Sequence, residues 1–120
     1  MQNGVDIVQI SRFEKLMHNE SFLNKYFSKI ECEYISQKNK KIETVAGLYA
    51  IKEAVLKTLG IGIGNGLNLK DIVINHDKNG APFIEIDAKI QYYLNLKGCL
   101  NIAISVSHDG DYAVAFCVIN

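Results

Sequence analysis

One segment, from Thr44 to Gly66, constrains the fold more than the rest of the chain, because it joins the longest helical pattern to a run of alternating glycines. At about 100° per residue, Glu53 and Lys57 lie on one face of this helix. The other residues of that face are Ala46, Tyr49 and Ala50, and the opposite, apolar face consists of Leu48, Ile51, Val55 and Leu59. We therefore expect a central helix, beginning at Glu43 or Thr44 and ending at Leu59, that leaves a carboxylate accessible on one side.

The glycine run after this helix has two interpretations. Gly60 stands at the position where helices commonly end in a left-handed residue. Glycine recurs at 62, 64 and 66, which would let backbone N–H groups approach phosphate oxygens closely. The run lacks the spacing of a Walker motif, and a helix cap followed by a connector would look the same. On its own it therefore leaves phosphate binding at Gly60, Gly62 and Gly64 open.

Capping and turn signals divide the remaining sequence. Ser11–Glu14 and Ser28–Glu31 both have capping-box spacing, and Asn79–Gly80 is typical of a hairpin turn. These signals predict strands at 4–10, 71–76, 82–86, 100–107 and 112–119, and helices at 12–17, 19–27, 29–37 and 88–96, the last capped by Asp87. The fold class expected is α+β, with an antiparallel, hairpin-built sheet packed around the central helix.

Length and composition narrow the class of protein. A chain of 120 residues, 48% of them hydrophobic, is long enough for one domain spanning residues 1–120. Thirteen basic and thirteen acidic residues give no net charge, which disfavours nucleic acid as a partner. No apolar run approaches the about 20 residues of a membrane span. Three cysteines without C-x-x-C spacing, and no signal peptide, indicate reduced thiols and a cytoplasmic location.

Two acidic residues stand in settings where a carboxylate needs a partner. Asp6 lies within the apolar strand G-V-D-I-V-Q-I, and Glu53 precedes Lys57 by one helical turn. Taken singly, Asp6 could cap a helix or pair with a lysine, and Glu53 with Lys57 could be an ordinary ion pair. Together they match magnesium sites in which one or two carboxylates are completed by water and substrate phosphate. His108, expected in a turn, is either solvated or a phosphate ligand.

Several motifs resemble a known family. G-V-D-I at 4–7, followed by Arg12, and Y-A-I-K-E-A-V-L-K at 49–57 resemble the two signature motifs of the 4′-phosphopantetheinyl transferase superfamily. The glycine run, D-K-N-G-A-P at 77–82 and I-S-V-S-H at 104–108 resemble the small holo-[acyl-carrier-protein] synthase branch. The resemblance extends in order over essentially the whole chain.

This resemblance implies an activity and an assembly. The 4′-phosphopantetheine arm of coenzyme A would pass to a serine of apo-acyl carrier protein, as fatty acid biosynthesis requires, and adenosine 3′,5′-bisphosphate would be released. Asp6 and Glu53 would hold Mg²⁺ against the pyrophosphate, and Lys57 would contact the phosphate. The general base would be Glu53 or a metal-bound water. The family also implies a homotrimer with active sites between subunits.

The resemblance assigns further residues to ligands. The coenzyme A pocket would be lined by the glycine loop (Gly60, Gly62, Gly64) and by Asn79, Gly80, Pro82, Ser107 and His108. Lys52 would reach the nucleotide phosphate or be a snorkelling surface lysine. Arg12, Lys15 and Lys25 would dock the acidic carrier protein. Leu48 departs from the pattern, because many relatives have arginine there. The alternative function is a non-catalytic trimeric module that binds coenzyme A or a nucleotide.

Overall fold

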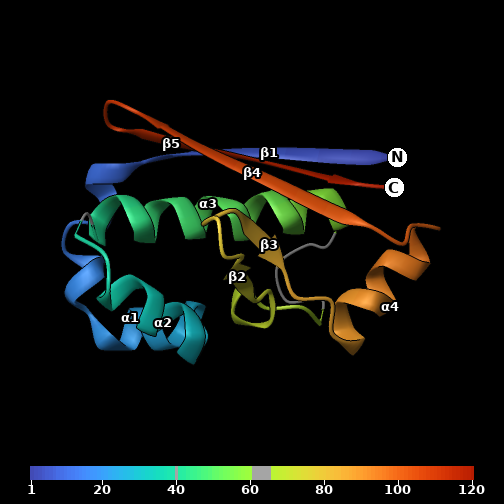
Figure 1. The fold of residues 1–120 in the computed structure, drawn as a ribbon, viewed down its shortest axis with the longest axis horizontal. Helices are drawn as coiled ribbons and strands as arrows, with labels where there is room; N and C mark the ends of the chain where they lie inside the picture. The colour runs from blue at the N-terminus through green and yellow to red at the C-terminus, as the bar shows by residue number, and fades with distance from the viewer. Residues whose placement is uncertain (40, 61–65) are drawn as a thin grey trace.

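Helix α3 (Lys41–Leu59) lies at the centre of the fold in the computed structural model, which describes residues 1–39, 41–60 and 66–120. A three-stranded sheet covers one side of α3, and short helices cover the other (Figure 1). The strands are β1 (Gln2–Gln9), β2 (Ile74–His76), β3 (Pro82–Ile84), β4 (Ile102–Asp109) and β5 (Tyr112–Ile119). The remaining helices are α1 (Glu20–Tyr26), α2 (Lys29–Ser36), α4 (Ala88–Leu96) and the 3₁₀ turns η1 (Ile10–Phe13), η2 (Leu16–His18) and η3 (Leu69–Asp71).

The large sheet is antiparallel and has the order β1-β5-β4, so the first strand pairs with the last. Asp6 lies opposite Ala115, which in turn lies opposite Val106. Alternate residues face α3 and are buried, as Ala113, Ala115 and Cys117 are. The other face of the sheet remains exposed, although it carries Val5, Ile7, Val114 and Phe116. Strands β2 and β3 form a separate two-stranded sheet.

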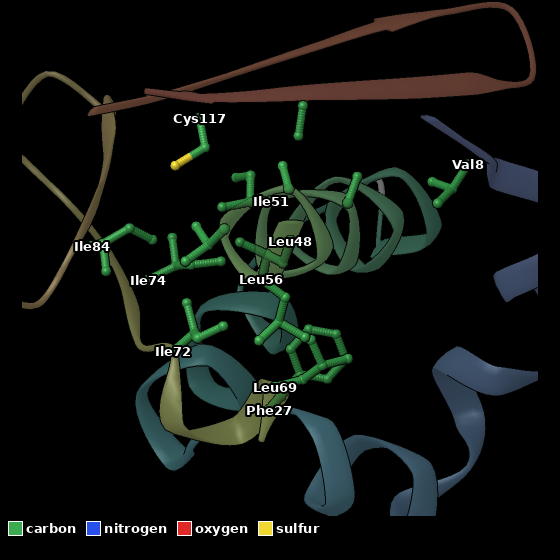
Figure 2. Packing of buried hydrophobic residues seen from close by; sticks show 14 of the residues in the cluster. Val8, Phe27, Leu48, Ile51, Leu56, Leu69, Ile72, Ile74, Ile84 and Cys117 are labelled. Atoms are coloured by element: carbon green, nitrogen blue, oxygen red, sulfur yellow. The ribbon is translucent and has the colours of Figure 1, made fainter. Parts of the chain in front are cut away.

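The core surrounds α3 on nearly all sides. Figure 2 shows Cys117 between the helix and the sheet, with Phe27 and Leu69 on the side of the helix away from the sheet. The expectation of one accessible face is wrong in part, because Ala46 and Ala50 are fully buried. The 3₁₀ helices, α1 and α2 cover that side of α3. The side chains that remain accessible there form a narrow stripe. It consists of Tyr49, Glu53 and Lys57, which are spaced one helical turn apart.

The capping predictions are confirmed where the two hydrogen-bonded residues lie within one turn of each other. The α+β class is confirmed, as are the capping box of Ser28 with Glu31 and the cap that Asp87 provides for α4. The capping box predicted at Ser11 is wrong, because its amide and hydroxyl donate to the Asp111 carboxylate at 2.8 and 2.7 Å. The predicted helix at 12–17 is two 3₁₀ turns. Strand β2 is shorter than predicted, because η3 occupies residues 69–71.

No helix among the described residues combines the length and the apolar character needed to cross a lipid bilayer.

Candidate active site

The contact between β1 and α3 depends on Gly4. A Cβ at this position would lie 2.5 Å from Thr58 Oγ1, 2.9 Å from the Ala54 carbonyl oxygen and 3.0 Å from Thr58 N. Two of these atoms belong to the helix backbone, so any larger residue would push the strand away. Residues i and i+2 of a strand share a face, so Asp6 also points at α3. The spacing G-x-D therefore brings a carboxylate against the helix.

Asp6 meets Lys57 at this contact. Lys57 Nζ lies 2.9 Å from Asp6 Oδ1 and donates to the Val5 carbonyl oxygen at 3.2 Å. The Asp6 side chain is only 13% exposed, whereas Lys57 is 55% exposed. A mostly buried carboxylate thus has one ammonium group beside it that solvent, or an anion, can reach. Of the two alternatives for Asp6 alone, pairing with a lysine is the one observed.

Glu53 lies one turn before Lys57 on the same face, about 6 Å along the helix axis. It borders a groove of about 500 Å³, which we call the Glu53 groove. The groove is lined by Lys25, Tyr26, Tyr49, Glu53, Leu56, Leu67, Asn68, Leu69, Lys70 and Asp71. Burial raises the pKa of Tyr49, and the charge of Glu53 and a hydrogen bond with it add to this effect. Glu53 therefore faces a cavity that is apolar at its base and has lysines at its rim.

Asp6 and Glu53 suit a divalent cation only if water and substrate oxygens complete its coordination. Among the described residues, no three His, Cys, Asp or Glu side chains gather as a complete metal site. Asp6 and Glu53 flank Lys57, which leaves two carboxylates on one face of α3. Mg²⁺ commonly takes one or two protein carboxylates and completes its shell with water and substrate phosphate. The donors present therefore fit a magnesium ion that arrives with a phosphorylated substrate.

A second concave site lies near the other end of α3. Gly47 permits it, because a Cβ there would lie 3.0 Å from His108 Nε2. His108 lies in β4, not in a turn as predicted, and its Nε2 donates to the Glu43 carbonyl oxygen at 3.1 Å. This His108 cleft, of about 140 Å³, is lined by Tyr34, Glu43, Thr44, Gly47, Leu48, Ile51, His76, Val106 and His108.

The β2–β3 hairpin brings further predicted residues towards the His108 cleft. Pro82 pairs with His76, which lines the cleft, and Asn79 and Gly80 form the turn between the strands. Leu48 is almost fully buried in the cleft wall, where a longer charged side chain would need space. Ser107 is different: it faces the outer side of the sheet beside Ile7 and Val114, away from the cleft. Ser107 and His108 thus lie on opposite faces of β4.

The structure contradicts both interpretations of Lys52 made from the sequence, the phosphate contact and the surface lysine. It is fully buried, and its Nζ lies 2.7 Å from Glu31 Oε1. It also donates to the carbonyl oxygens of Leu69 and Ile72 at 2.9 and 2.7 Å. Burial lowers the pKa of Lys52, which the charge of Glu31 and the hydrogen bond to it oppose. An ammonium group held in this way reaches neither a nucleotide phosphate nor the surface.

Two of the three residues predicted to dock the carrier protein, Arg12 and Lys25, lie beside the accessible stripe of α3, and Lys15 lies next to Arg12. The Arg12 guanidinium lies 4.9 Å from the centre of the Phe13 ring and 5.4 Å from that of Tyr49. Arg12 and Lys15 line one surface hollow, and Lys25 lines the Glu53 groove. A positively charged rim therefore adjoins an aromatic cluster of Phe13, Phe22, Tyr26 and Tyr49.

The glycine run is described only at its ends. Gly60 has a φ of 67°, which confirms it as the left-handed residue that ends α3. Gly62 and Gly64 lie outside the described residues. Gly60 itself is exposed, three residues after Lys57, and a Cβ placed on it would lie 3.0 Å from Lys97 Nζ.

The sequence interpretation missed two aromatic residues of the His108 cleft, Tyr34 and His76, and one contact of Tyr49. Tyr34 and His76 stack in the His108 cleft, with ring centres 3.8 Å apart and an angle of 8° between the rings. Tyr49 was placed on the correct face but not linked to Glu53. Spacing could have found the Tyr49–Glu53 pair, because residues i and i+4 are helix neighbours. No local signal connects Tyr34 with His76.

Comparisons with known proteins identify the family and the fold. The 4′-phosphopantetheinyl transferase superfamily matches residues 2–117. The holo-[acyl-carrier-protein] synthase of Campylobacter lari is 41% identical over 118 residues, which cover 97% of this chain and 96% of that protein. The Helicobacter pylori holo-[acyl-carrier-protein] synthase in complex with coenzyme A has a TM-score of 0.85 at 33% identity, covering 98% of this chain and 99% of that one. The Neisseria meningitidis enzyme gives 0.88 at 27%, covering 99% and 97%.

Proposed function

This chain belongs to the 4′-phosphopantetheinyl transferase superfamily and is an enzyme similar to its holo-[acyl-carrier-protein] synthases, and we propose that it transfers 4′-phosphopantetheine from coenzyme A to a serine of apo-acyl carrier protein. The carrier protein would be that of fatty acid biosynthesis, and the reaction would take place in the cytoplasm. The free state of Cys32, Cys99 and Cys117 supports this location.

The observation that carries the proposal is the group Asp6, Glu53 and Lys57. Two acids and a lysine gather on one accessible face of α3, beside a groove of substrate size. A protein that only holds coenzyme A gains nothing from two carboxylates near a negatively charged pyrophosphate. A transferase needs them, because positioning and charge neutralisation contribute most of the catalysis in phosphoryl transfer.

The bonds made and broken follow from the substrates. The serine oxygen forms a bond to the β-phosphorus of coenzyme A. The bond from that phosphorus to the bridging oxygen breaks, and adenosine 3′,5′-bisphosphate leaves with the oxygen. Lys57 stabilises the negative charge that develops on this leaving group.

The serine must lose its proton as the new bond forms. Glu53 is the acceptor we assign, because its carboxylate lies in the groove. Asp71 also borders the groove, but its oxygens are occupied by the Asn68 amide, at 2.9 Å, and by Lys89, at 3.3 Å. Glu53 therefore remains the acid best placed for proton transfer.

Asp6 and Glu53 are also the residues that would hold Mg²⁺. When bound, the ion supplies positive charge that polarises the pyrophosphate and lowers its repulsion of the incoming oxygen. Lys57 then has a second role on the protein side. By pairing with Asp6 at 2.9 Å it holds this mostly buried carboxylate in place against α3.

Two subunits would complete each site. Lys57 lies on the face of α3 that carries Glu53, and Gly47 lies in the wall of the His108 cleft. Their separation of ten positions corresponds to about 15 Å along the helix, and the two sites lie on different sides of α3. One coenzyme A molecule would therefore meet the Asp6–Glu53 group of one subunit and the His108 cleft of another. The exposed apolar face of the sheet supports such a homotrimer, because patches of this kind mark interfaces.

Arg12, Lys15 and Lys25 would receive the acidic carrier protein at the rim of the Glu53 groove. The aromatic cluster beneath them offers an apolar surface next to these charges. Docking here directs the carrier serine towards Glu53, since Lys25 and Glu53 border the same groove.

The test is to incubate the full chain with apo-carrier protein, coenzyme A and Mg²⁺, and to measure the intact mass of the carrier. We expect the mass to increase by one phosphopantetheine group. If coenzyme A binds but no adduct forms, while a known transferase modifies the same carrier, the non-catalytic alternative is correct.

Asp6→Asn and Glu53→Gln remove one charge each at nearly constant size. We expect each to lower kcat by about 100-fold or more, since electrostatic groups at a reacting centre contribute on this scale. Glu33→Gln is the matched control, because Glu33 is exposed on α2. A rate in either test variant close to that of the control would contradict the assignment.

A further inference from the structure

The interior contains an ion pair that the proposed reaction does not use. Lys52 Nζ has three oxygen neighbours: Glu31 Oε1, the Leu69 carbonyl and the Ile72 carbonyl, at 2.7 to 2.9 Å. Glu31 Oε1 also accepts from the Ser28 amide at 2.7 Å, and Oε2 accepts from the Ile74 amide at 2.8 Å. Both side chains are completely buried. Five hydrogen bonds therefore meet at two charged groups that are shielded from solvent.

These bonds join three parts of the chain that are distant in sequence. Lys52 belongs to α3, and Glu31 and Ser28 belong to the start of α2. The other partners, Leu69, Ile72 and Ile74, lie in residues 69–74, which return to α3 after the glycine run. A buried ion pair loses so much hydration that apolar residues of similar size often stabilise a fold equally well or better. Stability alone is therefore a weak reason for the pair. A fixed geometry is a stronger reason.

Two of the three parts that the pair joins, α3 and residues 69–71, are walls of the Glu53 groove, and α2 holds Glu31 behind them. Leu69, Lys70 and Asp71 form one wall, α3 supplies Tyr49, Glu53 and Leu56, and α1 supplies Lys25 and Tyr26. Residue 69, which binds Lys52 through its carbonyl oxygen, is itself in the wall. Lys52 immediately precedes Glu53 on α3. A change in the length or charge of Lys52 would thus shift the wall relative to the Glu53 carboxylate.

We propose that Lys52 and Glu31 are positioning residues for the transfer reaction: their ion pair fixes the wall at residues 69–71 at a set distance from Glu53. This inference rests on the proposed function. Neither residue touches a substrate, and both act through the groove. The K-E pair of the motif then has two separate tasks. Glu53 takes part in the chemistry, and Lys52 holds the surface opposite Glu53 in place.

The main test variant is the double substitution Lys52→Met/Glu31→Gln, which removes both charges together and leaves no unpaired charge inside. Glu31→Gln alone keeps the length of both side chains and removes one charge only, which leaves the Lys52 ammonium without its counter-ion. Ile119→Val is the control, because Ile119 is fully buried at the end of β5, away from the groove. Each protein is assayed at a temperature at which circular dichroism shows the same folded fraction as the wild type. The values of kcat and of KM for coenzyme A and for carrier protein are measured separately.

We expect kcat/KM to fall at least tenfold in the double variant and less in Glu31→Gln, with a change below twofold in Ile119→Val. A purely structural role would lower the melting temperature and leave kcat/KM of the folded enzyme unchanged, which would overturn the inference. If the double variant does not fold, the result for Glu31→Gln decides by the same criterion. Absence of any adduct with wild-type protein would instead overturn the proposed function, and this inference with it.

Discussion

Gly4→Ala is the substitution whose effect follows most directly from the geometry. It adds one methyl group to a strand residue with ordinary backbone angles, so what matters is the space around it. The new Cβ would lie 2.5 Å from Thr58 Oγ1 and 2.9 Å from the Ala54 carbonyl oxygen. Van der Waals contact begins at about 3.4 Å, so β1 must move about 0.9 Å away from α3.

This displacement has a cost in stability and a cost in activity. Overpacking of this kind costs about 1–3 kcal/mol. For a chain of this length, each kcal/mol corresponds to about 4 °C, so the melting temperature should fall by about 4–12 °C. Asp6 lies two residues along the same strand face and moves with Gly4. A shift of about 1 Å at a reacting group costs up to about 100-fold in rate.

The assay combines thermal unfolding with the rate of carrier modification. Thr58→Ala in the Gly4→Ala background provides the internal check. It removes the nearest clashing atom, Oγ1, but leaves the two backbone contacts, so the double variant should recover part of the loss. Strict additivity of the two substitutions, or a Gly4→Ala protein with wild-type melting temperature and rate, would refute the close-contact explanation.

Three further predictions follow. Lys57→Met should lower kcat by about 100-fold, because the developing charge and Asp6 both lose their cation; steady-state kinetics would show it, and an unchanged kcat would contradict it. Phe116→Glu should reduce the subunit number measured by light scattering and lower activity with it, whereas Tyr92→Glu, on exposed α4, should change neither; an intact assembly would exclude this face as the interface. Burial, and then the charge of Lys38, lower the pKa of His76, so the unfolded chain binds its proton first as the pH falls through about 6.5. The free energy of unfolding should therefore fall between about pH 7.5 and 5.5, and less so in His76→Phe; equal declines in urea titrations of both proteins would be contrary to this reasoning.

The sequence predicted those parts of the fold whose causes are local. Ser28 with Glu31, Asp87 and Gly60 are capping signals that act within one turn, and each was found where expected. Ser11 has the same spacing as Ser28, yet it bonds to Asp111, which is close only in the folded chain. A capping box and a long-range contact cannot be distinguished by spacing. They differ in which partner the fold brings closer.

The site shows the same division. Asp6 and Glu53 were selected as candidates because two carboxylates in apolar or small-residue settings each need a partner, and the structure shows Lys57 as the partner of Asp6. Lys52 was misinterpreted, because helical periodicity treats a lysine as a surface residue, and its partners at 31, 69 and 72 come from other elements. The stacking of Tyr34 on His76 depends likewise on how α2 and β2 meet. Chemistry that arises from packing between elements becomes predictable only with the structure.

The pairing of β1 with β5 has a consequence for the order in which the site forms (Figure 1). During translation Asp6 leaves the ribosome early, whereas its strand acquires its neighbour only when residues 112–119 follow. Contacts between distant segments form slowly, because a long loop must close first. Until then the acid is part of an unpaired strand, so a nascent chain lacks the assembled contact between Asp6 and Lys57 on α3. The divalent-cation binding that we propose for Asp6 and Glu53 should thus appear late in biogenesis, together with the last strand.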